Sequence, residues 1–79
     1  MKVAVQLFGP LAEQAGRSRL EVTVTGATVQ DVLAAVALAA PALRIDKSVR
    51  YAVNTDYAES SASLREGDIL SLIPPVGGG

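Results

Sequence analysis

Several residue types that carry chemistry are missing from this 79-residue sequence, which has no cysteine, no histidine and no tryptophan. Without cysteine and histidine the chain cannot form disulfides, thiol nucleophiles, Ser-His or Cys-His catalytic pairs, or the usual zinc ligand sets, so we expect no metal site. Net charge is only −1, there is no run of Lys or Arg, and the aromatic residues are one Phe and two Tyr. A nucleic-acid-binding surface needs clustered cations and stacking rings, so we expect none here.

Long apolar segments are missing as well. The longest such run, residues 32–42, is rich in alanine and too short to span a bilayer, and the segment that begins Met1-Lys2 has a strand pattern rather than that of a signal peptide. With 49% hydrophobic and 19% charged residues, the composition is typical of one small globular domain. We therefore expect a soluble cytoplasmic protein that makes no membrane contact.

The first half of the chain has the pattern of two strands and a helix. Apolar residues alternate over residues 2–8 and again over 20–25, which predicts a hairpin, and a short helical turn over 11–15 is expected between the two strands. Thr28 followed three residues later by Asp31 predicts a capped helix start, and the apolar spacing continues to residue 40. Pro41 is expected to end this helix.

The second half predicts further strands and completes the fold class. Residues 49–53 alternate, 54–56 have turn chemistry, and Tyr57-Ala58 reads as a short return strand. The nearly continuous apolar run at 69–73 indicates a central strand that pairs with the first. The prediction is therefore an α+β protein of the β-grasp (ubiquitin-like) type, a mixed sheet of four to five strands crossed by one main helix. Its domain spans residues 1–73, and an extended C-terminal tail spans 74–79.

The tail has a composition suited to entering a narrow channel. Pro74 and Pro75 enforce an extended chain that cannot continue a sheet, Val76 offers a small apolar anchor, and Gly77, Gly78 and Gly79 carry no side chains. The terminal carboxyl group, with a pKa of about 3.3–3.7, is ionised at neutral pH and a poor electrophile. The chain has no phosphate loop or nucleophile to activate it. We therefore expect a carrier that a partner activates, with no catalytic machinery and no bound cofactor of its own.

Several other side chains can be interpreted either as ordinary structural residues or as part of a binding surface. Phe8, Leu64 and Ile73 are either core residues or part of a partner-docking surface, and Leu64 also reads as the anchor of a turn over 64–68. Tyr51 and Tyr57 are expected to pack with wet hydroxyls. The remaining polar candidates fit ordinary surface positions: the carboxylates Glu13, Glu66 and Asp68, and a loose basic cluster of Arg44, Lys47 and Arg50 that could also pair with an acidic partner loop.

Over nearly its whole length the chain resembles the MoaD-type sulfur-carrier subunits of molybdopterin synthase, in the MoaD/ThiS ubiquitin-like family. The matching pieces, of which the tail is the most specific, are Val3–Phe8, Leu11-Ala12-Glu13 with Gly16, Thr28–Leu33, Ala52-Val53-Asn54 with Tyr57, Leu64, Gly67-Asp68 and Ile73–Gly79. The sequence departs from the family at Ala12, where an Arg is common, and at Gly77, where Ser or Thr is usual. The extra glycine is expected to raise the entropy lost on docking by up to about 1 kcal/mol.

The resemblance implies a reaction cycle. An ATP-using adenylyltransferase related to ubiquitin-activating enzymes adenylates Gly79, and a persulfide donor converts it to a thiocarboxylate. The carrier then docks on the large catalytic subunit of molybdopterin synthase, in a heterotetramer, and its tail delivers sulfur to cyclic pyranopterin monophosphate. Three alternatives remain open: a sulfur carrier for thiamine or tRNA thiolation, a ubiquitin-like covalent modifier attached through Gly79, and an interaction module with an inert tail.

Overall fold

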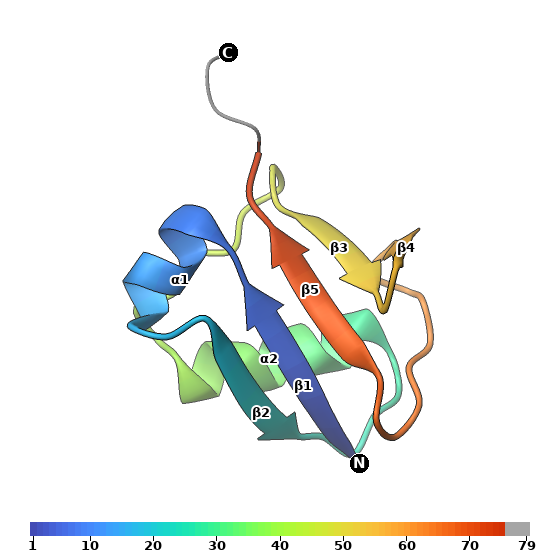
Figure 1. Ribbon diagram of the computed structural model, residues 1–79. Helices are drawn as coiled ribbons and strands as arrows, with labels where there is room; N and C mark the ends of the chain where they lie inside the picture. The colour runs from blue at the N-terminus through green and yellow to red at the C-terminus, as the bar shows by residue number, and fades with distance from the viewer. Residues whose placement is uncertain (76–79) are drawn as a thin grey trace.

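The computed structural model describes residues 1–75, which form one mixed sheet and two helices (Figure 1). The sheet has five strands in the order β2-β1-β5-β3-β4. The elements in chain order are β1 (Lys2–Leu7), α1 (Gly9–Ala15), β2 (Arg19–Thr23), α2 (Val29–Ala39), β3 (Arg50–Val53), β4 (Asp56–Ala58) and β5 (Ile69–Ile73).

Strand β5 lies in the middle of the sheet, as its apolar run predicts. It pairs in parallel with β1 and antiparallel with β3, while β1–β2 and β3–β4 are antiparallel hairpins. Figure 1 shows α2 crossing one face of this sheet and α1 at the end of β1. A mixed sheet with parallel central strands and one helix across it is the ubiquitin-like β-grasp arrangement, so the predicted fold is confirmed.

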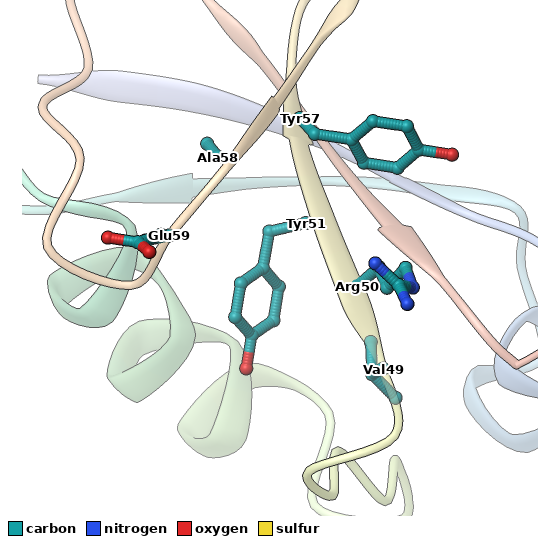
Figure 2. A pocket seen from close by; sticks show the side chains of 6 residues that line it. All are labelled: Val49, Arg50, Tyr51, Tyr57, Ala58 and Glu59. Carbon is teal, nitrogen blue, oxygen red and sulfur yellow. The ribbon is translucent and has the colours of Figure 1, made fainter.

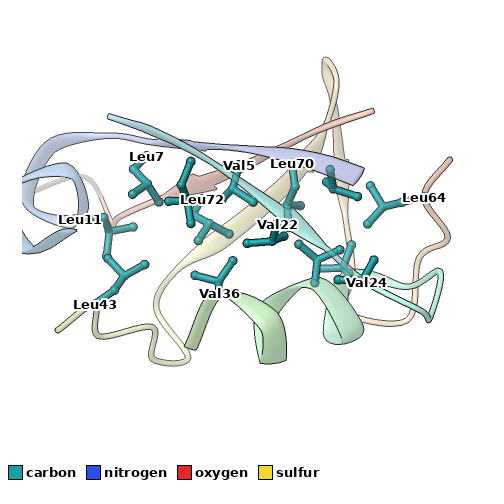
Figure 3. Close-up of a cluster of buried hydrophobic side chains, with 14 of the residues drawn as sticks. Val5, Leu7, Leu11, Val22, Val24, Val36, Leu43, Leu64, Leu70 and Leu72 are labelled. Carbon is teal, nitrogen blue, oxygen red and sulfur yellow. The ribbon is translucent and has the colours of Figure 1, made fainter. Parts of the chain in front are cut away.

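The core lies between α2 and the face of the sheet that α2 covers (Figure 3). Alternate residues of the two central strands, among them Val5 and Leu70, point into it and are fully buried. Val29, Val32 and Val36 supply the buried stripe of α2, as their helical spacing predicts. Burying apolar side chains of this size contributes about 1.5–3 kcal/mol each, so this layer holds the sheet and helix together.

Helix α2 begins at the predicted cap. The backbone N–H of Asp31 donates to the Thr28 hydroxyl, and the backbone N–H of Thr28 donates to the Asp31 carboxylate. Both bonds satisfy N–H groups that a helix start leaves free, and those accepted from Thr28 are the main reason that the pKa of Asp31 lies below its ordinary value of 3.8. The helix ends at Ala39, with Ala40 as its cap, one residue before Pro41.

Several element boundaries differ from the sequence prediction by one residue, and two differ by two residues. Helix α1 starts at Gly9 rather than at residue 11, because a proline is accommodated in the first turn of a helix, where its missing N–H costs nothing. Strand β2 ends at Thr23 rather than at residue 25, although Val24 remains buried. In residues 1–75 no helix has both the length and the apolar character required to cross a membrane.

Candidate functional site: the root of the C-terminal tail

The tail leaves the molecule from the end of the central strand. Ile73 is the last residue of β5 and lies opposite Arg50 of β3. Pro74 follows, half-buried, and Pro75 is exposed, with neither residue in a strand. Because proline has no backbone N–H, the ladder cannot continue through these positions. The chain is therefore released from the sheet at Ile73, at the end of the molecule opposite the N-terminus (Figure 1).

The remaining predicted tail residues, Val76, Gly77, Gly78 and Gly79, lie outside the described residues. Their predicted chemistry is therefore taken up as a proposal below. The described part of the site is the tail root, by which we mean Ile73, Pro74 and Pro75 with the surface around them.

A cleft of about 300 Å³ lies beside the tail root, between α1 and the loop that leads to β3. The Gln14 side-chain oxygen accepts the backbone N–H of Arg44 at 2.8 Å, which ties the loop to the helix. Asp46 accepts the hydroxyl and the backbone N–H of Ser48, and the hydroxyl bond is the main reason that its pKa is lowered. The cleft thus has an ordered polar rim. Its lining residues are Pro10, Leu11, Gln14, Arg44, Asp46, Ser48, Val49, Pro74 and Pro75.

Two of the three predicted docking residues lie at the surface near the tail root. The parallel pairing of Leu7 with Leu72 brings the ends of β1 and β5 side by side, so Phe8 and Ile73 are both next to the exit point. The Phe8 side chain is 45% exposed, and Ile73 is partly buried. Along the two strands the buried residues alternate with less buried ones, and Ile73 lies on the face that α2 does not cover. We call this the open face.

The docking interpretation of Leu64 is wrong. Its side chain is 4% exposed and belongs to the hydrophobic core (Figure 3), and its backbone N–H donates to the carbonyl of Ala27 at 2.6 Å. The physical reason is that the loop before β5 folds back over the start of α2, where Ser63 bridges Thr28. Leu64 is therefore the anchor of the turn over residues 64–68, which is the alternative interpretation from the sequence.

The two tyrosines lie on opposite sides of the β3–β4 hairpin. Tyr51 is opposite Ala58, and Ala52 is opposite Tyr57, so the two rings point to different faces, as Figure 2 shows. Tyr51 packs against the core as expected, but Tyr57 is 73% exposed. The expectation that Tyr57 packs is therefore wrong, and the open face gains an aromatic residue that the sequence analysis did not identify. The two-residue turn sets this register, and a one-residue change in register would reverse it.

Two of the three carboxylates weighed as acid–base candidates, Asp68 and Glu66, have structural roles. Asp68 accepts the backbone N–H of Arg65 and the Asn54 amide, and these bonds, the Arg65 one first, lower its pKa. Glu66 accepts the backbone N–H of Lys2. Both lie at the end of the molecule away from the tail root. Across residues 1–75, no three His, Cys, Asp or Glu side chains gather in a way that could hold a metal ion.

Comparisons with known proteins agree with this geometry. The model of the ThiS family matches residues 5–79. The molybdopterin synthase sulfur carrier subunit of Chlamydomonas reinhardtii is 32% identical, and the alignment covers all of both chains. Both the described domain and the tail sequence are therefore included in the similarity.

Two solved structures show how this fold is used elsewhere. The crystal structure of SAMP1, small archaeal modifier protein 1, from Haloferax volcanii superposes with a TM-score of 0.89 at 34% identity, with full coverage of both chains. A chain in the complex of subunits 1 and 2 of molybdopterin-converting factor from Helicobacter pylori superposes with a TM-score of 0.72 at 25% identity, again with full coverage of both. Similar chains thus include a modifier protein and a protein bound to a second subunit.

Proposed function

The chain belongs to the ThiS family, and on this premise we propose that it is a sulfur carrier whose Gly79 carries the sulfur as a thiocarboxylate. The observation that supports the proposal most strongly is the position at which the tail leaves the sheet. A central strand, fixed on both sides by β1 and β3, ends at Ile73, and two prolines then direct the chain away from the sheet. A rigid platform that presents a side-chain-free end suits delivery of a terminal group into a partner's active site.

The chemistry proceeds in balanced steps. A carboxylate oxygen of Gly79 attacks the α-phosphate of ATP on a partner adenylyltransferase, which forms an acyl-adenylate and releases pyrophosphate. The terminal sulfur of a persulfide donor then attacks the acyl carbon and displaces AMP. A thiol reduces the resulting acyl disulfide and leaves the thiocarboxylate. The chain itself contributes the acyl group and binds no cofactor, and because activation consumes ATP, the proposed place of action is the cytoplasm.

The proposed recipient is the large catalytic subunit of molybdopterin synthase, with two carriers bound to a subunit dimer as a heterotetramer. The proposed docking surface consists of Phe8 and Ile73 beside the tail root, together with Tyr57 on the open face of the edge strand β4. Aromatic residues such as Phe and Tyr are enriched at protein–protein interfaces relative to the rest of the surface. A chain of similar fold is bound to a second subunit in the Helicobacter pylori complex, which supports docking of this kind.

A second candidate function is covalent modification of proteins through Gly79. The similarity to the SAMP1 structure, at 34% identity and a TM-score of 0.89, supports this second candidate function. The same adenylate serves both functions, because either a persulfide sulfur or a lysine amine can displace AMP. A carrier for thiamine or tRNA thiolation would use the same thiocarboxylate, so these pathways differ only in the recipient.

Genetic complementation separates these functions. We expect the chain, expressed with its cognate partners, to restore molybdenum-cofactor-dependent activity to a strain that lacks its own sulfur carrier, and a variant lacking Gly79 to fail. Restoration of thiamine synthesis or of tRNA thiolation instead would reassign the recipient. Lysine-linked adducts of the chain in extracts, without any restoration, would favour the modifier. Equal activity of the variant lacking Gly79 would refute a role for the tail.

A further inference from the structure

Three cations surround the point where the tail leaves the sheet. Arg50 lies opposite Ile73, and Arg44 lines the cleft together with Pro74 and Pro75. Lys47 lies between Asp46 and Ser48, which line the same cleft. All three side chains are exposed. We call Arg44, Lys47 and Arg50 the basic cluster.

Several carboxylates are at the other end of the molecule. Glu66 accepts the backbone N–H of Lys2 at the start of β1, and Asp68 precedes β5. Asp56 begins β4 opposite Val53, and Asp31 caps the start of α2. The whole chain has a net charge of −1, and these four carboxylates place much of its negative charge at the end away from the tail root.

Within the basic cluster one carboxylate, Asp46, is already engaged. It accepts the backbone N–H and the hydroxyl of Ser48, and these bonds lower its pKa, so it is ionised at neutral pH. Segment 44–50 thus has three positive charges and one negative charge. Two further carboxylates lie at this end of the molecule: Glu13 on α1 and Glu59, which lines a pocket together with Arg50. Two further cations lie there as well, because Arg17 follows α1 and Arg19 begins β2, so five cations face three carboxylates. The surface around the tail root therefore has a net positive charge.

We propose that the basic cluster is a docking surface for acidic side chains of the protein partner that activates the tail, with an apolar partner side chain seated in the adjacent cleft. The proposal rests on the proposed function. Charge complementarity points to an acidic partner, and the rings of Pro10, Pro74 and Pro75 in the cleft lining offer apolar contact. Arginine suits this role because its guanidinium can bind a carboxylate through two parallel hydrogen bonds.

A polyanion such as nucleic acid or free nucleotide fits this surface less well. Asp46 lies between Arg44 and Lys47 and would repel phosphate, and the apolar part of the cleft would gain nothing from it. A protein surface can instead present carboxylates to the cations and an apolar residue to the cleft. Such peripheral charges act mainly on the association rate, and salt screens them.

The test compares two charge-reversal variants with the same change in net charge. Arg44→Glu with Lys47→Glu reverses two of the three charges of the basic cluster, whereas Lys2→Glu with Arg65→Glu reverses two exposed cations at the opposite end. Association of each full-length chain with its purified cognate adenylyltransferase is followed by stopped-flow fluorescence at low and at physiological salt. We expect the first variant to associate at least about tenfold more slowly at low salt, with a weaker dependence on salt, and the second to stay within about twofold of wild type.

Equal rates for wild type and both variants, or equal losses in both, would overturn the proposal. Binding of ATP alone to the carrier, lost in the Arg44→Glu/Lys47→Glu variant, would assign the cluster to nucleotide instead. If that variant unfolds, Arg44→Gln with Lys47→Gln replaces it, with an expected slowing of about threefold.

The intact mass of wild type after reaction separates this proposal from the proposed function. A thiocarboxylate formed at unchanged rates in both variants refutes the docking surface alone. Absence of both binding and mass change in wild type refutes both.

Discussion

Asn54 and Asp68 are joined by a hydrogen bond of 3.1 Å from the Asn54 amide nitrogen to the Asp68 carboxylate, which ties the β3–β4 turn to the turn before β5. The Asn54 side-chain oxygen also accepts the backbone N–H of Ile69. Asn54 has a positive φ of 57°, a conformation that asparagine tolerates better than most residues. One side chain therefore both forms the turn and fixes the start of the central strand.

This arrangement predicts that a glycine variant at position 54 is more stable than an alanine variant. Asn54→Gly keeps access to positive φ but loses both hydrogen bonds, so we expect a loss of about 1–2 kcal/mol in unfolding free energy. Asn54→Ala loses the same bonds and adds backbone strain, for a further loss of about 1 kcal/mol. Urea unfolding at neutral pH measures both. An alanine variant as stable as the glycine variant would show that the positive φ carries no cost.

Alanine variants of Phe8 and Leu64 should distinguish a surface position from a core position. Leu64→Ala is expected to lower the unfolding free energy by about 2–4 kcal/mol, because it opens a cavity in a buried cluster. Phe8→Ala should cost less than about 1 kcal/mol in stability but weaken binding of the large subunit by about tenfold or more. Denaturant unfolding and a binding titration test the pair. A reversed pattern would mean that the assignments of the two residues are exchanged.

The capping box predicts a pH-dependent stability. Since the folded-state pKa of Asp31 is lowered, its contribution is complete well above 3.8 and is lost as the pH falls through that value and the lower folded one. Thr28→Ala, which removes the hydroxyl of the cap, should cost about 1 kcal/mol at pH 7. In urea unfolding we expect the difference in unfolding free energy between Thr28→Ala and wild type to become smaller below pH 3.8. Thr25→Ala, at an exposed position before the cap, is the control and should show neither effect.

Much of the fold follows from local patterns in the sequence. The alternation of Val3, Val5 and Leu7, the Thr28–Asp31 cap and the apolar run at 69–73 each predict an element that the structure contains. These signals are reliable because burial of one face and satisfaction of helix-end N–H groups depend on near neighbours in the chain.

The positions of single side chains were harder to predict. The path of the loop over the start of α2 buries Leu64, whereas Phe8 is exposed where β1 turns into α1. Neither path can be read from the residues next to these two side chains in the chain. Tyr57 faces away from the core because of the register across the Asn54-Thr55 turn. The gathering of Arg44 and Arg50 around Pro74 depends on pairing between distant segments, so the sequence indicated only a loose cluster.

The intact mass of the reacted chain tests the central claim most directly. Purified carrier is incubated with its cognate adenylyltransferase, ATP and a persulfide donor with reducing thiol, and its mass is compared with that of a variant lacking Gly79. We predict that wild type gains the mass difference between one sulfur and one oxygen atom, that fragmentation places it on Gly79, and that the variant is unchanged. A wild-type mass that stays unchanged while the adenylyltransferase modifies a known carrier would contradict the account.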